Sequence, residues 1–89
     1  MARNTAYFRT LNERIAATAA ELGFDGFVPL LCECPDPRCF RLARATLAEF
    51  EALREHPERL VLYPGHEDVT EDKVLAATDR YTLVERGTG

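Results

Sequence analysis

The sequence predicts an α+β fold, in which a small, mostly antiparallel sheet of three to five strands packs against two helices. Three observations predict it. The chain has 89 residues, the length of a single domain, so residues 1–89 are taken as one unit. Two segments repeat apolar residues at helical spacing, and short apolar runs between and after them end at turn signals.

Residues 5–22 are expected to form the first helix. Asn4 or Thr5 can cap its start, and Gly23 stands where a left-handed residue closes a helix. Apolar residues recur every three or four positions and so share one helical face, which we expect to pack on the sheet: Phe8, Leu11, Ile15, Ala19 and Leu22.

A strand is expected over residues 27–34, with a short returning strand over residues 40–43. Alternate residues from Val28 to Cys34 fall on one face of the first of these strands. Pro29 has no amide donor, which indicates an edge strand or a bulge. The segment CPDPRC then forms the tip of a hairpin.

The second helix has the clearest signals in the chain. Thr46 and Glu49 have the spacing of a capping box, and Leu47, Phe50 and Leu53 supply an apolar face. The helix is expected to stop at Pro57.

Two strands are expected in the remaining part, over residues 60–63 and 81–85. The first ends at the turn dipeptide Pro64-Gly65. Residues 74–77 are ambiguous, because the polar residues before them can open a short helix. We favour a hairpin, since Thr78-Asp79-Arg80 is typical of a turn into the last strand.

Cys32, Cys34 and Cys39 form a C-x-C-x4-C pattern, and His66 directly follows the Pro64-Gly65 turn. Three thiolates and one imidazole are a complete tetrahedral set for zinc. If the strand over residues 60–63 lies beside the first strand, it brings the histidine to the cysteines. Since the protein would supply all four ligands, the sequence predicts a closed, structural zinc site.

Other interpretations of the same residues stay open. The thiols can be small buried side chains, with His66 a surface turn residue. One of them can be reactive or redox-active. Three cysteines and a histidine also hold a [2Fe–2S] cluster in small CDGSH-type proteins, which share the C-x-C opening. In those proteins, however, the histidine follows closely after the third cysteine, whereas here Phe40 and Arg41 do.

Several charged residues lie near the predicted metal ligands in sequence. Glu33, Asp36, Glu67 and Asp68 are either acceptors for the free ring nitrogen of His66 or solvated loop charges. His56, in the last turn of the second helix, is expected to interact with the helix dipole and not with a metal.

The charge balance excludes some partners. Fifteen acidic and eleven basic residues give a net charge of −4, which argues against nucleic acid or an anionic membrane. We find no membrane-length apolar run and no signal peptide, so we expect a cytoplasmic protein with reduced thiols. No catalytic motif is present either, and we expect a regulatory or protein-interaction module and not an enzyme. No pattern indicates an oligomeric state.

The chain resembles a group of small uncharacterised bacterial proteins of the actinobacterial type. The resemblance extends over nearly the whole chain, and the blocks that carry it are FRTLNERI, LCECPDPRC, TLAEFEALREHPERL, YPGHED and DRYTLVER. Its most distinctive motifs are CECxDxxC and PGHE. The resemblance implies a complete domain and a strand-like segment over residues 74–85, and it implies no activity, substrate or cofactor.

Overall fold

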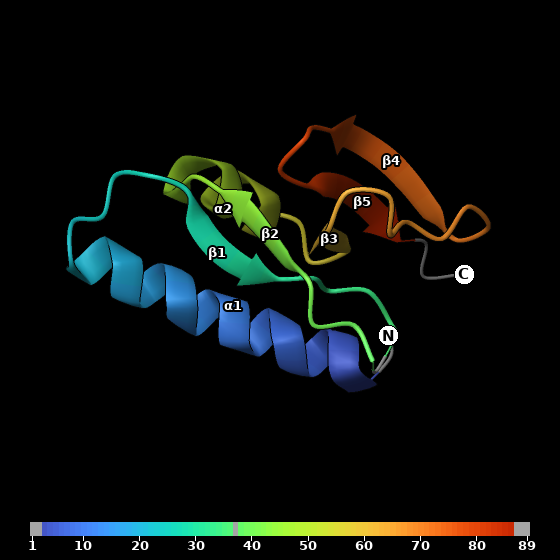
Figure 1. The fold of residues 1–89 in the computed structure, drawn as a ribbon, viewed down its shortest axis with the longest axis horizontal. Coiled ribbons are helices and arrows are strands. Elements are labelled where there is room, and N and C mark those ends of the chain that lie inside the picture. The colour runs from blue at the N-terminus through green and yellow to red at the C-terminus, as the bar shows by residue number, and fades with distance from the viewer. Residues whose placement is uncertain (1–2, 37, 87–89) are drawn as a thin grey trace.

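The computed structural model describes residues 3–36 and 38–86, and within them the chain has the predicted α+β class (Figure 1). The helices are α1 (Arg3–Glu21) and α2 (Leu47–Arg54). The strands are β1 (Val28–Leu31), β2 (Leu42–Ala45), β3 (Arg59–Leu62), β4 (Asp72–Ala77) and β5 (Thr82–Arg86).

The strands form two antiparallel sheets. β1 pairs with β2, and β5 lies between β3 and β4 in the second sheet. Pro29 therefore lies in a two-stranded ribbon, as its missing donor predicts. Just beyond β1, the amide of Glu33 donates to the carbonyl of Val61 at 3.0 Å. The hairpin thus contacts β3 at the cysteine segment but does not join the second sheet as a further strand.

The hairpin expected in the last third of the chain is confirmed. β4 and β5 pair from Asp72↔Arg86 to Ala77↔Thr82, with an irregularity between Val74 and Ala76. In the connecting turn, the amide of Thr78 donates to the carbonyl of Tyr81 at 2.8 Å.

Helix α1 begins at Arg3, so it starts before the caps that the sequence suggests. The hydroxyl of Thr5 instead donates to the carbonyl of Glu33 at 3.0 Å, and its side chain is buried. At the other end Gly23 has a φ of +68°, and the backbone bonds there form a Schellman motif, which confirms the predicted C-terminal cap.

The buried face of α1 differs from a purely apolar stripe. Phe8 is buried, but Leu22 is 79% exposed, and the polar Asn12 is fully buried. The Asn12 amide donates to the carbonyl of Leu31 at 2.8 Å and accepts from its N–H at 2.7 Å. α1 therefore packs against β1 partly through a polar side chain that satisfies strand backbone groups.

Helix α2 begins as predicted. Thr46 accepts from the amide of Glu49 at 3.1 Å, and the Glu49 carboxylate accepts from the amide of Thr46 at 2.9 Å. Phe50 and Leu53 point into the core. These contacts confirm the capping box and the apolar face of the helix.

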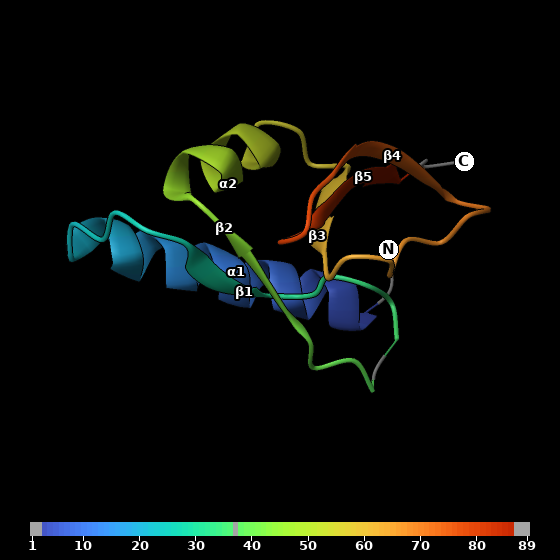
Figure 2. The same ribbon diagram turned by 45° about the horizontal axis from the view of Figure 1, so that its top comes forward.

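Two apolar clusters make up the core. α1 runs along β1, and the three-stranded sheet lies at one end of the molecule (Figure 2). One cluster joins both helices, the hairpin, β3 and Tyr81, and comprises Ala16, Val28, Leu30, Ala43, Ala45, Phe50, Leu53, Val61 and Tyr81. The other lies between the hairpin tip and the second sheet and comprises Cys32, Cys34, Cys39, Leu60, Leu62 and Val84.

Candidate metal centre

The four residues expected to bind zinc meet in space. One potential ligand atom from each of Cys32, Cys34, Cys39 and His66 lies within 4.8 Å of all the others. The Nδ1 atom of His66 is 3.5 Å from the Sγ atom of Cys39 and 3.7 Å from that of Cys32. The three cysteines are thiols and not disulfides. The cluster can therefore hold a metal ion.

The thiols are presented by the tip of the β1–β2 hairpin. The amide of Cys32 donates to the carbonyl of Arg41 at 3.0 Å, which continues the pairing of the two strands by one step. The amide of Cys39 donates to the carbonyl of Asp36 at 3.1 Å, closing a turn. The chain thus reverses between the second and third cysteines, which brings Cys39 back towards Cys32.

The histidine is placed by a tight turn after β3. The amide of His66 donates to the carbonyl of Tyr63 at 3.0 Å, and Gly65 has a φ of +87°. Pro64 and Gly65 thus occupy the second and third positions of a four-residue turn, which is typical of type II. This local geometry is what the Pro64-Gly65 dipeptide predicts.

β3 also contacts the thiols directly. The amide of Tyr63 donates to the Sγ atom of Cys32 at 3.1 Å. The three cysteines are only 1%, 4% and 7% exposed, so they are more buried than the charged residues around them in sequence suggest. Leu60, Leu62 and Val84 form the apolar wall behind them.

The two sulfur–nitrogen distances in the cluster fit a single tetrahedral ion. With a Zn–S bond of about 2.3 Å and a Zn–N bond of about 2.0–2.1 Å, a tetrahedron has S···N edges of about 3.6 Å. The Cys39–His66 and Cys32–His66 distances are 3.5 and 3.7 Å. These atoms are therefore already at the separation that one zinc ion requires.

Burial favours the protonated form of two of the thiols. Removal from water raises the pKa of Cys32 and of Cys34, although backbone amides from Tyr63 and Asp36, respectively, act in the opposite direction. A thiol in such surroundings keeps its proton unless a cation stabilises the thiolate. Metal binding at this cluster must therefore displace protons.

Glu33 lies between two of the thiols in sequence, but the described partners of its carboxylate lie outside the cluster. Its oxygens accept from the side chains of Asn12 and Arg54 and from the amide of Val61. The side chain is fully buried, and this burial raises the pKa of Glu33, against the effect of the Arg54 guanidinium. These partners differ from the expected contact with His66.

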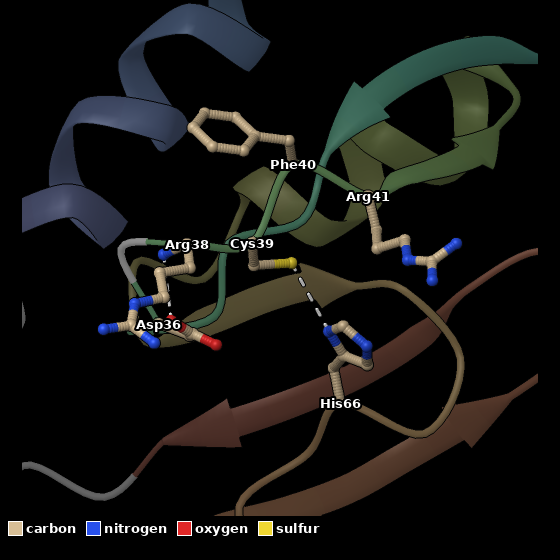
Figure 3. Close-up of a pocket in the computed structure, with 6 residues that line it drawn as sticks. All are labelled: Asp36, Arg38, Cys39, Phe40, Arg41 and His66. Carbon is tan, nitrogen blue, oxygen red and sulfur yellow. Dashed lines mark hydrogen bonds between the residues drawn. The ribbon is translucent and has the colours of Figure 1, made fainter.

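The other acidic residues near the cluster have separate surroundings. The Oδ1 atom of Asp36 accepts from the amide of Arg38 at 2.9 Å, and Asp36 lines a surface hollow together with His66 (Figure 3). Asp68 accepts from Thr70, and these bonds lower the pKa of Asp68. The Oε1 atom of Glu67 is buried and has no hydrogen-bond partner among the described residues.

His56 is separate from the cluster, as predicted. Its side chain is 46% exposed, and its Nδ1 atom lies 3.8 Å from Glu58. Sequence reasoning missed Asn12 and Arg54, which hold the carboxylate between the first two cysteines. The available signal was a polar residue, Asn12, directly beside the apolar stripe of α1.

No known protein family, curated protein or solved structure matches the chain. Among the described residues, no helix is long and apolar enough to span a membrane.

Proposed function

We propose that Cys32, Cys34, Cys39 and His66 bind one zinc ion, and that the metal stabilises a small, non-enzymatic module for protein interaction or regulation. The observation that carries the proposal is the convergence of four ligand atoms, all within 4.8 Å of one another, from two separate segments. Thiolate and imidazole are the donors that structural zinc sites use.

The compactness of the cluster favours a single ion over a [2Fe–2S] cluster. In a binuclear cluster, two ligands belong to each iron, so the two pairs are held farther apart than the ligands of one ion. Here all four donors lie within 4.8 Å of one another, and Nδ1 of His66 is almost equally close to two sulfurs. One tetrahedral zinc ion accounts for this arrangement.

The size of the domain gives the metal an energetic role. Small domains have a net stability at the low end of about 5–15 kcal/mol. Structural zinc contributes an apparent free energy of about 10–16 kcal/mol in finger peptides. Zinc at the hairpin tip would join β1, β2 and the turn after β3, and so fix the hairpin to the second sheet.

The 3.5 Å contact between Cys39 and His66 favours a second candidate, a reactive cysteine–histidine pair. In such a pair, one thiol is hydrogen-bonded to one ring nitrogen of the imidazole, and a third group orients the ring through the other nitrogen. The described contacts instead place two thiols beside the same Nδ1 atom, and among the described residues no hydrogen bond reaches Nε2. A shared ligand set accounts for both contacts better than a catalytic pair does.

The surface supports a role in protein interaction. Phe40, which precedes β2, is 73% exposed, and Leu42, the first residue of β2, is 52% exposed. Exposed large apolar side chains beside one another are typical of protein contacts. The net charge of −4 makes nucleic acid a poor partner. We therefore propose a protein partner.

A titration of metal-free protein with Co²⁺ tests the metal site, because tetrahedral cobalt bound to thiolates absorbs strongly in the visible range. We expect saturation at one ion per chain. We expect C39S to abolish this absorption. Removal of a residue that only supports a metal ligand typically lowers metal affinity by roughly 10–100-fold. H66A removes a ligand itself, so we expect it to lower the affinity for cobalt by more than this.

H56A is the matched control, because His56 is exposed and lies outside the cluster. Its cobalt spectrum and affinity should equal those of the wild type. Wild-type protein that folds but binds no cobalt would overturn the proposal and favour buried thiols without metal.

A further inference from the structure

An open hollow lies beside the cluster and gives access to one of the thiols. Its lining comes from the hairpin tip and the turn after β3, and comprises Asp36, Arg38, Cys39, Phe40, Arg41 and His66 (Figure 3). Cys39 is the cysteine in this lining, whereas Cys32 and Cys34 are not part of it. Cys39 is also the most exposed of the three, at 7% against 1% and 4%.

Hydrogen bonds distinguish the same thiol. The sulfur of Cys32 accepts from the amides of Tyr63 and Cys34, and that of Cys34 accepts from the amide of Asp36. Amide donors stabilise a thiolate and so reduce its nucleophilicity. For Cys39, the described hydrogen bonds to sulfur join it to His66 and to the side chain of Cys34, and none of them comes from a backbone amide (Figure 3). Cys39 is therefore both the most accessible and the least shielded of the three thiols.

The hollow favours reagents with negative charge. Arg38 and Arg41 are exposed, and neither forms an ion pair within the described part of the chain. The guanidinium of Arg41 lies over the ring of Tyr63, 5.3 Å from its centre. Asp36 supplies the one carboxylate of the lining, and its Oδ1 atom accepts from the backbone of Arg38. The lining thus carries a net positive charge on an acidic protein.

We propose that Cys39 is a thiol-modification site at which small anionic disulfides react, and that this reaction opens the zinc site. The proposal rests on the proposed zinc function for its second part, the release of the metal. The first part, the preference for Cys39 and for anionic reagents, depends only on the hollow and its charges.

The chemistry balances in two exchange steps. The thiolate of Cys39 attacks one sulfur of the disulfide, so a mixed disulfide forms and one small thiolate leaves. The thiolate of Cys34, whose sulfur lies within 4.8 Å, then attacks the Cys39 sulfur and expels the second small thiolate. Two protein thiolates are oxidised to a disulfide, the reagent is reduced to two thiolates, and zinc loses two of its four ligands.

The test compares two reagents on zinc-loaded protein: the anionic dithiobis(nitrobenzoate) and the neutral 4,4′-dithiodipyridine. Both release a coloured product, so rates are read directly, and a chromophoric indicator reports zinc. For mapping, the protein reacts with a substoichiometric amount of reagent, and the reaction is stopped in acid. Peptide mass mapping then identifies the modified cysteine. We expect Cys39 to be modified first, and zinc release to follow this first modification.

R41Q and R38Q test the role of the charges, and R14Q is the control, because Arg14 is exposed on α1 and does not line the hollow. At low ionic strength we expect each hollow variant to lower the anionic-to-neutral rate ratio about threefold to fivefold, and salt to reduce this difference. R14Q should leave the ratio unchanged.

First modification of Cys32 or Cys34, or a ratio that is the same in all variants, would overturn the proposal. The mapping is repeated on metal-free protein, so the two hypotheses can fail separately. Protein that binds no zinc but reacts first at Cys39 overturns the proposed function and with it the release of zinc, whereas the modification site at Cys39 stands. Zinc-loaded protein that reacts first elsewhere overturns the modification site alone.

Discussion

Glu49 joins the start of α2 to the turn between β4 and β5 through a single carboxylate. It caps the helix through the amide of Thr46, accepts from the guanidinium of Arg80 at 2.9 and 3.1 Å, and accepts from the hydroxyl of Tyr81 at 2.9 Å. These donors, Arg80 foremost, lower the pKa of Glu49 to about 2. One residue thus connects helix and sheet outside the cluster of three cysteines and His66.

This depressed pKa gives stability a defined dependence on pH. The ordinary pKa of a glutamate is 4.5, and that of folded Glu49 is about 2. The folded state therefore binds the proton less tightly than the unfolded state does, so the contribution of Glu49 is complete above pH 4.5 and is lost as the pH falls towards 2. We expect E49Q to unfold at lower urea concentration than the wild type at pH 7.

The difference in unfolding free energy between wild type and E49Q should narrow below pH 4.5. Urea unfolding measures it, with sucrose added to keep both proteins folded in acid. The thiol–histidine cluster is the same in both proteins, so its own pH dependence cancels. Equal stability at pH 7, or a gap that persists undiminished below pH 3, would show that Glu49 does not act in this way.

At the scale of elements, Glu33 ties the cysteine segment to both helices and to β3. Asn12 comes from α1, Arg54 from α2 and the Val61 amide from β3, and all three donate to the same buried carboxylate. Since Cys32 and Cys34 flank Glu33, the elements that hold this carboxylate also hold the first two thiols. Packing around this carboxylate thus fixes the position of the C-x-C segment.

We expect E33Q to lower the free energy of unfolding by about 3–5 kcal/mol, because Arg54 would be left without its buried counter-charge. Arg54 is 12% exposed. Thermal or urea unfolding of the metal-loaded proteins measures the loss. E13Q is the control: Glu13 is 56% exposed and lies 3.6 Å from the same guanidinium, so its removal should cost less than about 1 kcal/mol. Equal losses for the two variants would contradict this role of Glu33.

The sequence predicted the elements whose signals are local. The capping box of α2, the closure of α1 at Gly23 and the turn at Pro64-Gly65 each depend on residues a few positions apart. The convergence of the four candidate ligands was also predictable, because it follows from a hairpin tip and an adjacent strand.

Features that depend on distant pairings were not predictable. Asn12 bonds to Leu31, and Arg54 to Glu33, across about twenty residues, and nothing in the local pattern of either residue indicates its partner. The division of the strands into two sheets also depends on a distant pairing. The hairpin meets β3 through the backbone bond from Glu33 to Val61 and does not pair with it as a further strand. Such contacts follow from the tertiary fold and not from spacing.

At the scale of the whole molecule, the cluster of three cysteines and His66 lies where the two sheets meet. The hairpin contributes the three thiols, the turn after β3 contributes the imidazole, and Leu60, Leu62 and Val84 complete the second core cluster. The other core cluster joins the helices, the hairpin and β3. The loss of the metal should therefore loosen the contact between the hairpin tip and the second sheet more than the packing of α1 on β1.

The measurement that tests the central claim most directly is the metal content of untagged protein purified without chelator, combined with thermal melting before and after the metal is removed. The account predicts one zinc ion per chain and a large fall in melting temperature on removal, restored by adding zinc. A folded protein that contains no metal, and whose melting temperature a chelator leaves unchanged, would contradict it.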